Sequence, residues 1–440
     1  MKKLLILAYD FPPYVSVGGL RPHAWYKYLR EFGIEPIVVT RQWSNKHGNA
    51  LDYISPSESS HTIEENNMYG TIIRAPFKPS LSNRLLLQYG SDKFKFIRKA
   101  LTAFDEIRQF ITISGPKKTL YTAARNYLQQ HKVDAIIATG EPFVLFYFAQ
   151  KLSAEFNTPW IADFRDTWSQ DENRSRNTLL YQWNNRIEKR LLATTQHIVT
   201  VSPFLQLQIQ KNAPTQQFHI ITNGYDPDVM NELAQRLPNK EQLSIAFVGT
   251  IYKWHPWQSF ITRFSKVVEA SSETMALRFY GTNLTAEIQT FLASFPPKTQ
   301  AAITFSPKLS NKELLQELTG NHVMLLFNYY SFMGTKIYDY LGIKRRIILC
   351  YENDKNALAL KEKFYPVQEN ELLSKTLQAD LLRETQAGIA VKDEDHLETV
   401  LKDLLAEFTA TRNIECNSIN TDNYSRKIQV KKLAEIISAI

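Results

Sequence analysis

Polar and charged side chains follow several apolar runs of this sequence, at positions where they could bind phosphate or hydroxyl groups. The first is the loop after the opening apolar run, which contains Gly18, Gly19 and Arg21. Paired glycines let backbone amides approach a ligand, and amides at a helix start bind anions, to which an arginine adds positive charge. These three residues therefore predict a site for a phosphate or for part of an acceptor. A simple tight turn is the alternative for the two glycines.

A second place lies in segment 161–168, where an apolar run leads into Asp163, Arg165 and Asp166. Open α/β sheets bind ligands at the carboxyl ends of their strands. Two carboxylates that flank an arginine at such an end could orient a hydroxyl group, so these three are the candidate catalytic residues. For either aspartate alone, an ion pair that only fixes the loop is the alternative.

Two further places lie in the second half of the chain, and both carry cations next to glycines. Gly249, Thr250 and Lys253 follow an apolar run, where the glycine would let phosphates approach and the lysine would offset their charge. Lys336 and Asp339 stand three residues apart in a short predicted helix, so they share one face. They could present a cation to a phosphate and a carboxylate to vicinal hydroxyls. A surface ion pair of small energy is the alternative for this pair.

These residues need a scaffold, and short apolar runs that alternate with amphipathic stretches predict an α/β fold with parallel strands. In the first half seven predicted strands fit one sheet, at residues 3–9, 36–40, 71–75, 133–139, 160–164, 198–202 and 218–222. In the second half we expect six strands, at residues 243–248, 276–280, 302–305, 323–327, 346–350 and 388–391.

The length of 440 residues favours two domains, and a polar run with a proline at residues 237–242 separates the two series of strands. We place the boundary there, which gives an N-terminal domain of residues 1–238 and a C-terminal domain of residues 239–420. Residues 421–440 contain a helix with an apolar stripe, and we expect this C-terminal helix to pack back on the N-terminal domain.

The composition limits the class of protein. The 52 Lys and Arg residues exceed the 44 Asp and Glu residues, and the net charge of +8 suits anionic partners such as nucleotide phosphates or phospholipid headgroups. Two cysteines support neither a disulfide framework nor a zinc site, and they indicate a reducing, cytoplasmic location. No apolar run is long enough to span a bilayer. The basic residues form no recognised nucleic-acid module, so we expect no nucleic-acid partner.

One segment, about residues 81–118, departs from the alternation of strands and helices. It carries eight Lys and Arg residues against three Asp and Glu residues, interleaved with aromatic and aliphatic side chains. This pattern is typical of a basic amphipathic helix. Two interpretations stay open. The segment is either a helical insertion packed on the N-terminal domain or an attachment to an anionic membrane surface, which would place the protein on the inner face of the plasma membrane.

Five patterns, in this order, resemble the GT4-type glycosyltransferases of the GT-B fold. They are Phe-Pro-Pro with Gly-Gly after the opening strand, Asp-Phe-Arg-Asp-x-Trp at 163–168, Asn-Gly-Tyr-Asp at 223–226, Phe-Val-Gly-Thr at 247–250, and Lys-x-x-Asp-Tyr-Leu at 336–341. The resemblance implies two Rossmann-like domains facing a central cleft, with the acceptor on the N-terminal domain and the donor on the C-terminal one. It also implies a metal-independent, hexosyltransferase-like enzyme that uses no cofactor but takes a nucleotide sugar, UDP- or GDP-linked, as co-substrate.

The resemblance assigns roles to residues as well. Gly249, Thr250 and Lys253 would line the diphosphate, and Asp339 would hold the donor ribose in place of the second glutamate of the family's Glu-x7-Glu motif. Ser331 occupies the position of the first glutamate, so that carboxylate is missing from the motif. Lys253 and Lys336 would stabilise the negative charge that develops on the leaving nucleoside diphosphate.

We therefore expect an enzyme that moves a sugar from a nucleotide-sugar donor to a hydroxyl of a sugar or lipid-linked acceptor. The resemblance suggests a role in the biosynthesis of cell-surface polysaccharide or glycolipid. Two alternatives stay open at this point: a nucleotide-sugar epimerase of the same architecture, and a non-catalytic protein that binds sugar nucleotides. Turnover of a donor with an acceptor would distinguish the transferase from both.

Overall fold

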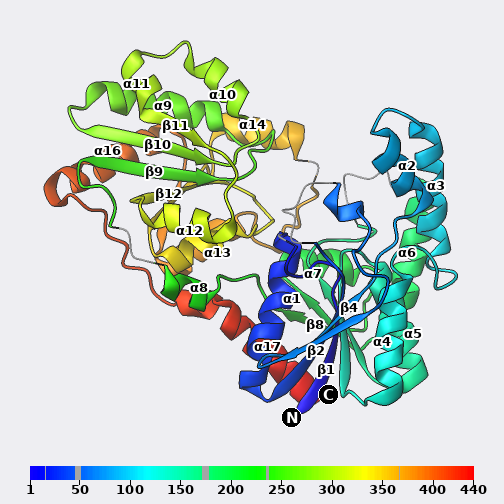
Figure 1. The fold of residues 1–440 in the computed structure, drawn as a ribbon. Coiled ribbons are helices and arrows are strands. Elements are labelled where there is room, and N and C mark those ends of the chain that lie inside the picture. Colours follow the sequence, from blue (N-terminus) through cyan, green and yellow to red (C-terminus); the bar gives the residue numbers. More distant parts are fainter. Residues whose placement is uncertain (15, 45–50, 171–177, 234–236, 366) are drawn as a thin grey trace. The chain divides into compact units, whose positions relative to one another are not determined.

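The computed structural model describes residues 1–440 except residues 15, 45–50, 171–177, 234–236 and 366. The chain forms two compact units: unit 1 comprises residues 1–222 and 427–440, and unit 2 comprises residues 223–426. Each unit is an α/β structure with helices on both faces of its own sheet (Figure 1). The division falls at Thr222–Asn223, ahead of the predicted boundary at residue 238, because α8 (Pro227–Glu232) packs against α13 (Lys336–Ile343) of unit 2.

Unit 1 is built on an eight-stranded sheet in the order β3-β4-β2-β1-β5-β6-β7-β8. The central strands are apolar and buried, as expected for parallel strands that helices cover on both faces. The strands are β1 (Lys2–Leu7), β2 (Ile34–Arg41), β3 (Ile63–Asn67), β4 (Gly70–Ala75), β5 (Ala135–Thr139), β6 (Trp160–Phe164), β7 (His197–Thr200) and β8 (Gln217–Ile220).

The edge strand β3 departs from the prediction of a purely parallel sheet. It pairs antiparallel with β4, whereas the other neighbouring strands are parallel. Every residue of β3 is exposed, and its sequence, Ile-Glu-Glu-Asn-Asn, has neither an apolar run nor an alternation of apolar and polar residues. The seven predicted strands correspond to the other seven strands, so only this polar edge strand was missed.

Helices cover both faces of the sheet of unit 1, with α1 and α17 on one face and α4, α5 and α6 on the other (Figure 1). The 3-10 helices η1 (Leu29–Phe32) and η2 (Asp52–Ile54) flank β2. The α-helices are α1 (Val17–Tyr28), α2 (Leu81–Tyr89), α3 (Lys95–Arg108), α4 (Lys118–Gln130), α5 (Val144–Phe156), α6 (Leu179–Leu192), α7 (Pro203–Gln210) and α17 (Arg426–Ala439).

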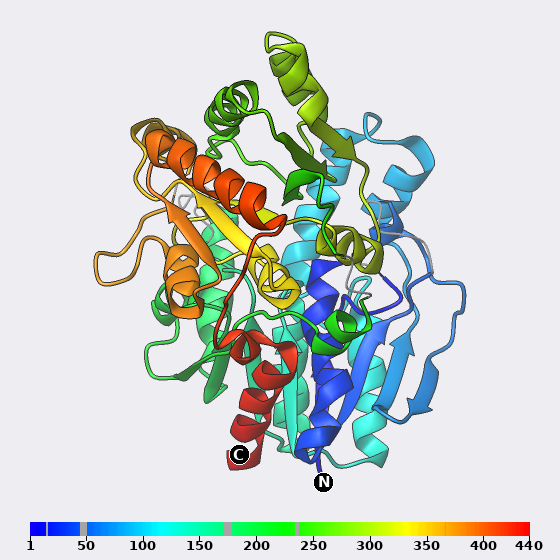
Figure 2. The same cartoon turned by 90° about the vertical axis from the view of Figure 1, so that its left-hand side faces the viewer.

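The last helix, α17, returns the chain to unit 1. Three side chains of α17 are buried in one apolar cluster with Trp25 and Tyr28 of α1, namely Val430, Leu433 and Ile437. The Nζ of Lys2 donates hydrogen bonds to the carbonyl oxygens of Ile437 and Ser438 (3.1 and 3.0 Å), so the two ends of the chain lie together (Figure 2). The apolar stripe of the helix is therefore the face that packs on the N-terminal domain.

Unit 2 has a six-stranded parallel sheet in the order β11-β10-β9-β12-β13-β14, and its strands are the six that were predicted. Helices α9 and α16 bury one face, and α12, α13 and α15 bury the other. The elements are β9 (Gln242–Val248), α9 (Trp257–Ala270), β10 (Thr274–Tyr280), α10 (Thr285–Leu292), α11 (Pro297–Ala302), β11 (Ile303–Ser306), α12 (Asn311–Thr319), β12 (Val323–Phe327), β13 (Arg346–Cys350), α14 (Lys355–Phe364), α15 (Leu377–Thr385), β14 (Gly388–Val391), α16 (Glu394–Thr411) and the 3-10 helix η3 (Thr421–Tyr424).

The segment that was predicted as a basic amphipathic insertion forms two helices, α2 and α3, which pack on each other as a hairpin and stand out from unit 1 (Figure 1). Within the described residues, no helix has both the length and the apolar character needed to cross a membrane.

Candidate active site

The carboxyl end of β1 in unit 1 places a carboxylate next to the start of α1. The Oδ2 of Asp10 accepts a hydrogen bond from the Oγ of Ser16 (2.6 Å), and Ser16 also caps α1 by accepting from the amide of Gly19 (3.0 Å). The other oxygen of Asp10, Oδ1, is buried and accepts no hydrogen bond from any residue that the structure describes. One side of this carboxylate is therefore held by the protein while the other lacks a donor.

Burial and the neighbouring groups shift the pKa of Asp10 in opposite directions. Burial raises the pKa of its carboxyl above the ordinary value of 3.8, whereas the hydrogen bond from Ser16 and the positive charge of Arg165 lower it. Burial is the largest of these effects, so the Asp10 pKa is raised on balance. A partly buried carboxylate with a raised pKa and a free acceptor is a common feature of catalytic sites.

Gly18 is the point where Asp10 and Arg165 come together. A Cβ atom at Gly18 would lie 2.6 Å from the Nη1 of Arg165 and 2.8 Å from the Oδ2 of Asp10, so only glycine fits without a shift of these groups. Arg165 is fixed further by donating from Nε to the carbonyl oxygen of Gly140 (2.7 Å) and from Nη2 to that of Glu141 (3.3 Å). The cluster thus joins the carboxyl ends of β1, β5 and β6.

The structure changes the expected role of the loop at Gly18, Gly19 and Arg21. The helix begins at Val17 and is capped by Ser16, so Gly18, Gly19 and Arg21 lie within its first turns. The anion near the helix start is the carboxylate of Asp10, which interacts favourably with the positive end of the helix dipole. The paired glycines thus make room for protein groups, Asp10 and Arg165.

Arg21 and Asp163, two of the predicted site residues, form an ion pair with each other in the interior of unit 1. The Oδ1 of Asp163 accepts from the Nε of Arg21 (3.0 Å) and lies 2.9 Å from its Nη2. Asp163 is 0% exposed and Arg21 is 6% exposed. Arg21 also donates from Nη1 to the carbonyl oxygens of Ile221 (2.8 Å) and Thr222 (3.2 Å), where the chain leaves unit 1. The geometry favours the alternative of a fixing ion pair for Asp163, because no surface of this side chain is accessible to an acceptor.

The predicted trio of Asp163, Arg165 and Asp166 is therefore divided. Asp163 is buried, Arg165 is partly exposed beside Gly18, and Asp166 is exposed. Sequence reasoning missed Asp10 and Ser16, although Asp10 stands at a strand end in the same way as Asp163 does. The sequence signal was the position of an acidic residue directly after an apolar strand.

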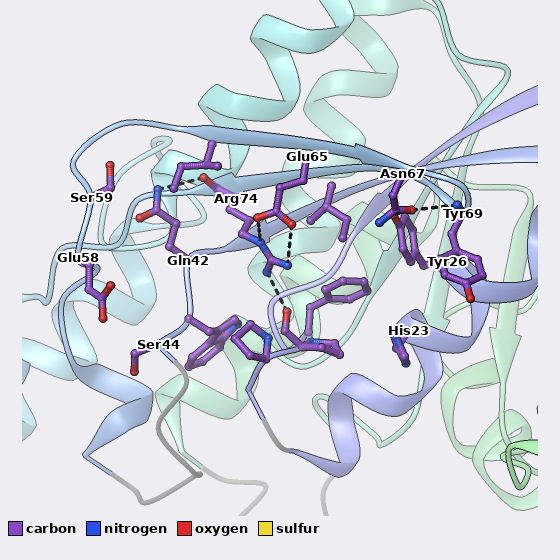
Figure 3. A pocket seen from close by; sticks show the side chains of 16 residues that line it. His23, Tyr26, Gln42, Ser44, Glu58, Ser59, Glu65, Asn67, Tyr69 and Arg74 are labelled. Atoms are coloured by element: carbon purple, nitrogen blue, oxygen red, sulfur yellow. Dashed lines mark hydrogen bonds and ion pairs between the residues drawn. The ribbon is translucent and has the colours of Figure 1, made fainter. Parts of the chain in front are cut away.

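A pocket of about 810 Å³ lies between α1 and the β3–β4 hairpin of unit 1 (Figure 3), and it is large enough for a small ligand. None of its residues was among the predicted site residues. Both aromatic and polar side chains line it: Phe11, Pro12, Pro13, His23, Tyr26, Gln42, Trp43, Ser44, Glu58, Ser59, Ile63, Glu65, Asn67, Tyr69, Ile72 and Arg74.

Hydrogen bonds hold the wall of this pocket in place. Arg74 is paired with Glu65 (2.7 Å) and donates to the carbonyl oxygen of Pro12 (2.8 Å), which ties β4 to the loop after β1 (Figure 3). The hydroxyl of Tyr26 donates to the Oδ1 of Asn67 (2.6 Å), which ties α1 to β3. These bonds fix the wall of the pocket, whose lining residues Phe11, Pro12 and Pro13 directly follow Asp10 in the chain.

In unit 2 the predicted donor-binding residues follow the carboxyl ends of the neighbouring strands β9 and β12. Gly249 has a positive φ of 91°, and a Cβ atom there would meet nothing within 4 Å, so its backbone is open to a ligand. Thr250 and Lys253 are exposed. Lys336 begins α13 and lies 3.7 Å from the carboxylate of Asp339, whose side chain is only 13% exposed. The predicted ion pair is present, and the charge of Lys336 is shared with Asp339.

Ser331 and His255 follow the same strands, and the structure gives both a fixed environment. Ser331, which stands where the resemblance expects a glutamate, donates from Oγ to the carboxylate of Glu369 (3.0 Å), and Lys361 lies 2.6 Å from the same carboxylate. A carboxylate from a distant segment thus reaches Ser331. His255 is 3% exposed, and burial lowers its pKa to about 3. Its Nδ1 accepts from the amide of Tyr252 (3.2 Å), so this neutral histidine is a part of the interior.

Comparison with known proteins identifies the N-terminal part of the chain. A model of Glycosyltransferase Family 4 matches residues 22–229. Residues 22–229 are therefore similar to glycosyltransferases of this family. None of the curated proteins matches the sequence. Among the residues described above, Arg21 lies one position before the matched range, and Asp163 and Arg165 lie within it.

Solved structures share the fold of the whole chain at low sequence identity. An α,α-trehalose-phosphate synthase from Burkholderia vietnamiensis is 9% identical with a TM-score of 0.58, and all of both chains is covered. A sucrose-phosphate synthase from Thermosynechococcus elongatus is 13% identical with a TM-score of 0.55, covering 100% of this chain and 97% of that one. A trehalose-6-phosphate structure from E. coli with bound UDP-2-fluoro glucose is 11% identical with a TM-score of 0.56, covering 99% and 95%. The chain therefore has the GT-B fold, with two Rossmann-like units.

Proposed function

We propose that this GT-B glycosyltransferase moves a sugar from a UDP- or GDP-sugar to a hydroxyl group of a sugar or lipid-linked acceptor, with unit 2 binding the donor and unit 1 the acceptor. The observation that carries the proposal is the cluster of Asp10, Ser16, Gly18 and Arg165, which places a partly buried carboxylate with a raised pKa at the end of β1, in the half of the chain that matches family 4. Bound UDP-2-fluoro glucose in a structure of the same fold supports the class of donor. A role in cell-surface polysaccharide or glycolipid biosynthesis, on the cytoplasmic side of the membrane, is part of the same proposal.

On the donor side, the open backbone at Gly249 lets the diphosphate approach the end of β9. Lys253 is exposed and can turn toward a phosphate, and Lys336 stands in the first turn of α13, where the helix dipole adds positive potential. As the bond between the sugar and the diphosphate breaks, negative charge develops on the leaving oxygen, and these cations stabilise it without a metal ion. Asp339 keeps Lys336 in place and is the candidate partner for the donor ribose.

On the acceptor side, Asp10 is the residue that orients the reacting hydroxyl, because its carboxyl lies at the end of β1 and is only partly buried. Ser16 holds the carboxylate by its hydrogen bond, and Arg165 adds positive charge nearby. The pocket beside α1 would bind the remainder of the acceptor, because its amide, carboxylate and aromatic groups match the hydroxyls and C–H faces of a sugar.

The first experiment measures release of the nucleoside diphosphate from a panel of UDP- and GDP-sugars, with and without candidate sugar acceptors. Asp10→Asn should lower the acceptor-dependent rate roughly 10- to 100-fold, because a hydrogen bond to a charged group contributes about 1.5–3 kcal/mol. The matched control is Asp403→Asn, which makes the same change at an exposed carboxylate of α16. A full transfer rate in Asp10→Asn would refute the role of Asp10, and donor binding without any turnover would favour the non-catalytic alternative.

The pocket is tested separately through the acceptor KM. Glu58→Gln and Tyr69→Ala should each raise this KM about tenfold, as expected for the loss of roughly one hydrogen bond or aromatic contact, and should leave donor binding unchanged. Glu435→Gln on α17 is the control, because Glu435 is also exposed in unit 1 but lies outside the pocket. If the acceptor KM does not change in either variant, the acceptor binds elsewhere.

A further inference from the structure

Helix α3 exposes its apolar side chains, which is the reverse of the usual arrangement for a helix of a folded domain. None of its residues is buried. Phe96 is 85% exposed, Phe104 is 59% exposed and Ile97 is 54% exposed. Singly exposed apolar residues are ordinary on protein surfaces, but a contiguous set on one helix marks an interaction site.

These side chains lie on one side of the helix. At about 100° of rotation per residue, Phe96, Ile97, Phe104 and Ile107 fall within an arc of roughly 100°, which we call the α3 face. The opposite side, which carries Arg98 and Thr102, packs on α2. There the hydroxyl of Ser82 donates to the carbonyl oxygen of Arg98 (3.1 Å) and lies 2.9 Å from the hydroxyl of Thr102.

The hairpin therefore uses its polar side to hold itself together and leaves the apolar side to solvent. If α3 were rotated by about half a turn about its own axis, α2 would cover the α3 face. The hairpin stands out from unit 1 (Figure 1), and none of the residues of α3 is buried.

Positive charge lies close to the α3 face. Lys99 is exposed beside it, Lys93 and Lys95 are exposed at the N-terminal end of α3, and segment 81–118 as a whole has eight cations against three acids. One of these acids, Asp105, is paired with Arg108 at 3.3 Å. Exposed aromatic and aliphatic side chains flanked by lysines match the surface of an anionic bilayer, with the lysines at the phosphates and the apolar groups at the acyl boundary.

We propose that the α3 face is a membrane-docking surface that binds anionic phospholipid bilayers, with Phe96 and Phe104 entering the interface. Binding by one short helix is reversible, and salt weakens it because the lysine charges are screened. The proposal stands on the exposure and charge of the hairpin and does not depend on the transferase activity. If the proposed function also holds, docking brings unit 1 to acceptors that are anchored in the bilayer.

The experiment is co-sedimentation of the full-length protein with vesicles of phosphatidylcholine and phosphatidylglycerol, and with vesicles of phosphatidylcholine alone, in 50 mM and 500 mM NaCl. We expect binding to the anionic vesicles at low salt, and at least tenfold weaker binding at high salt or without phosphatidylglycerol. F96S/F104S should weaken binding at least tenfold. Leu179→Ser is the matched control, because Leu179 is 86% exposed on α6 of the same unit.

The same assay tests the role of charge with K95E/K99E, which should also weaken binding to anionic vesicles at least tenfold. The control is K431E/K432E on α17, which gives the protein the same net charge. These side chains are exposed, so the far-ultraviolet circular dichroism and the melting temperature should not change. Absent binding at low salt, binding that is insensitive to F96S/F104S, or a dimer that dissociates in F96S/F104S would overturn the proposal. Transfer to a soluble acceptor is measured in parallel and should be unaffected, so failure of docking and failure of the proposed function are distinguishable.

Discussion

Replacement of Asp163 by Asn tests whether this residue stabilises the fold or takes part in the reaction. In the structure the carboxylate is fully buried, and its partner Arg21 is 6% exposed. Asp163→Asn keeps the shape but removes the negative charge, which leaves the guanidinium of Arg21 in the interior without a counter-charge. Breaking a buried ion pair in this way costs about 3–5 kcal/mol. For a unit of this size, 1 kcal/mol corresponds to roughly 2–4 °C, so the melting transition of unit 1 should fall by about 10 °C.

The assay follows thermal unfolding together with transferase activity at a temperature where the variant remains folded. We expect a large loss of stability and a nearly normal rate per folded molecule. Asp403→Asn provides the control for the chemical change itself. A second variant, Arg21→Met combined with Asp163→Leu, should be more stable than Asp163→Asn, because replacing both charges by apolar groups leaves no uncompensated charge. An unchanged melting temperature with loss of turnover in Asp163→Asn would refute this reasoning and return Asp163 to the catalytic residues.

Four other outcomes can be measured. Gly18→Ala should lower the transfer rate at least tenfold, because its Cβ would displace Arg165 and Asp10; a normal rate would mean that these groups shift freely. Asp10→Asn should leave the melting temperature at pH 7 unchanged or raise it. The raised pKa of Asp10 means that its ionised form is unfavourable in the fold, so the stability contributed by the protonated carboxyl is lost as the pH rises through the folded pKa. For His255 the pH dependence of stability has the opposite sign. Because its pKa is lowered to about 3, unit 2 should lose stability as the pH falls below 6.5, by up to about 1.4 kcal/mol per pH unit. Urea unfolding at pH 7 and pH 5 should show a smaller loss of stability in His255→Gln than in the wild type. Transfer should continue in excess EDTA if cations of the protein offset the diphosphate charge, and a rate that Mg²⁺ restores would contradict this.

The sequence predicted the fold well where the strands are buried. The central strands of both sheets, such as β1, β5, β9, β12 and β13, are mostly apolar runs, and such runs arise because helices cover both faces of the sheet. The edge strand β3 was missed because its exposed residues carry no pattern that burial would impose. The domain boundary was placed too late, since α8 is polar and its attachment to α13 is a tertiary contact that local composition does not reveal.

The candidate site was predicted less well, because its residues interact with partners that are distant in the sequence. Sequence patterns identified Arg21 and Asp163 as charged residues near strand ends, but only the structure shows that these two, far apart in the chain, neutralise each other. Asp10 was passed over because a single acidic residue after a strand is common. Its significance comes from Ser16, Arg165 and Gly18, which surround it only in the folded unit.

The two carboxylates at this end of the sheet illustrate how environment assigns roles to the same type of residue. Asp163 has lost all contact with solvent and has an arginine on one oxygen at 2.9 Å, so its charge is compensated and its position is fixed. Asp10 is only partly buried and is held by the neutral hydroxyl of Ser16. Burial raises the pKa of Asp10, so its ionised form is unfavourable in the fold, and its carboxyl lies where a ligand can approach. Removal of the Asp163 charge should accordingly affect folding, and removal of the Asp10 charge should affect transfer.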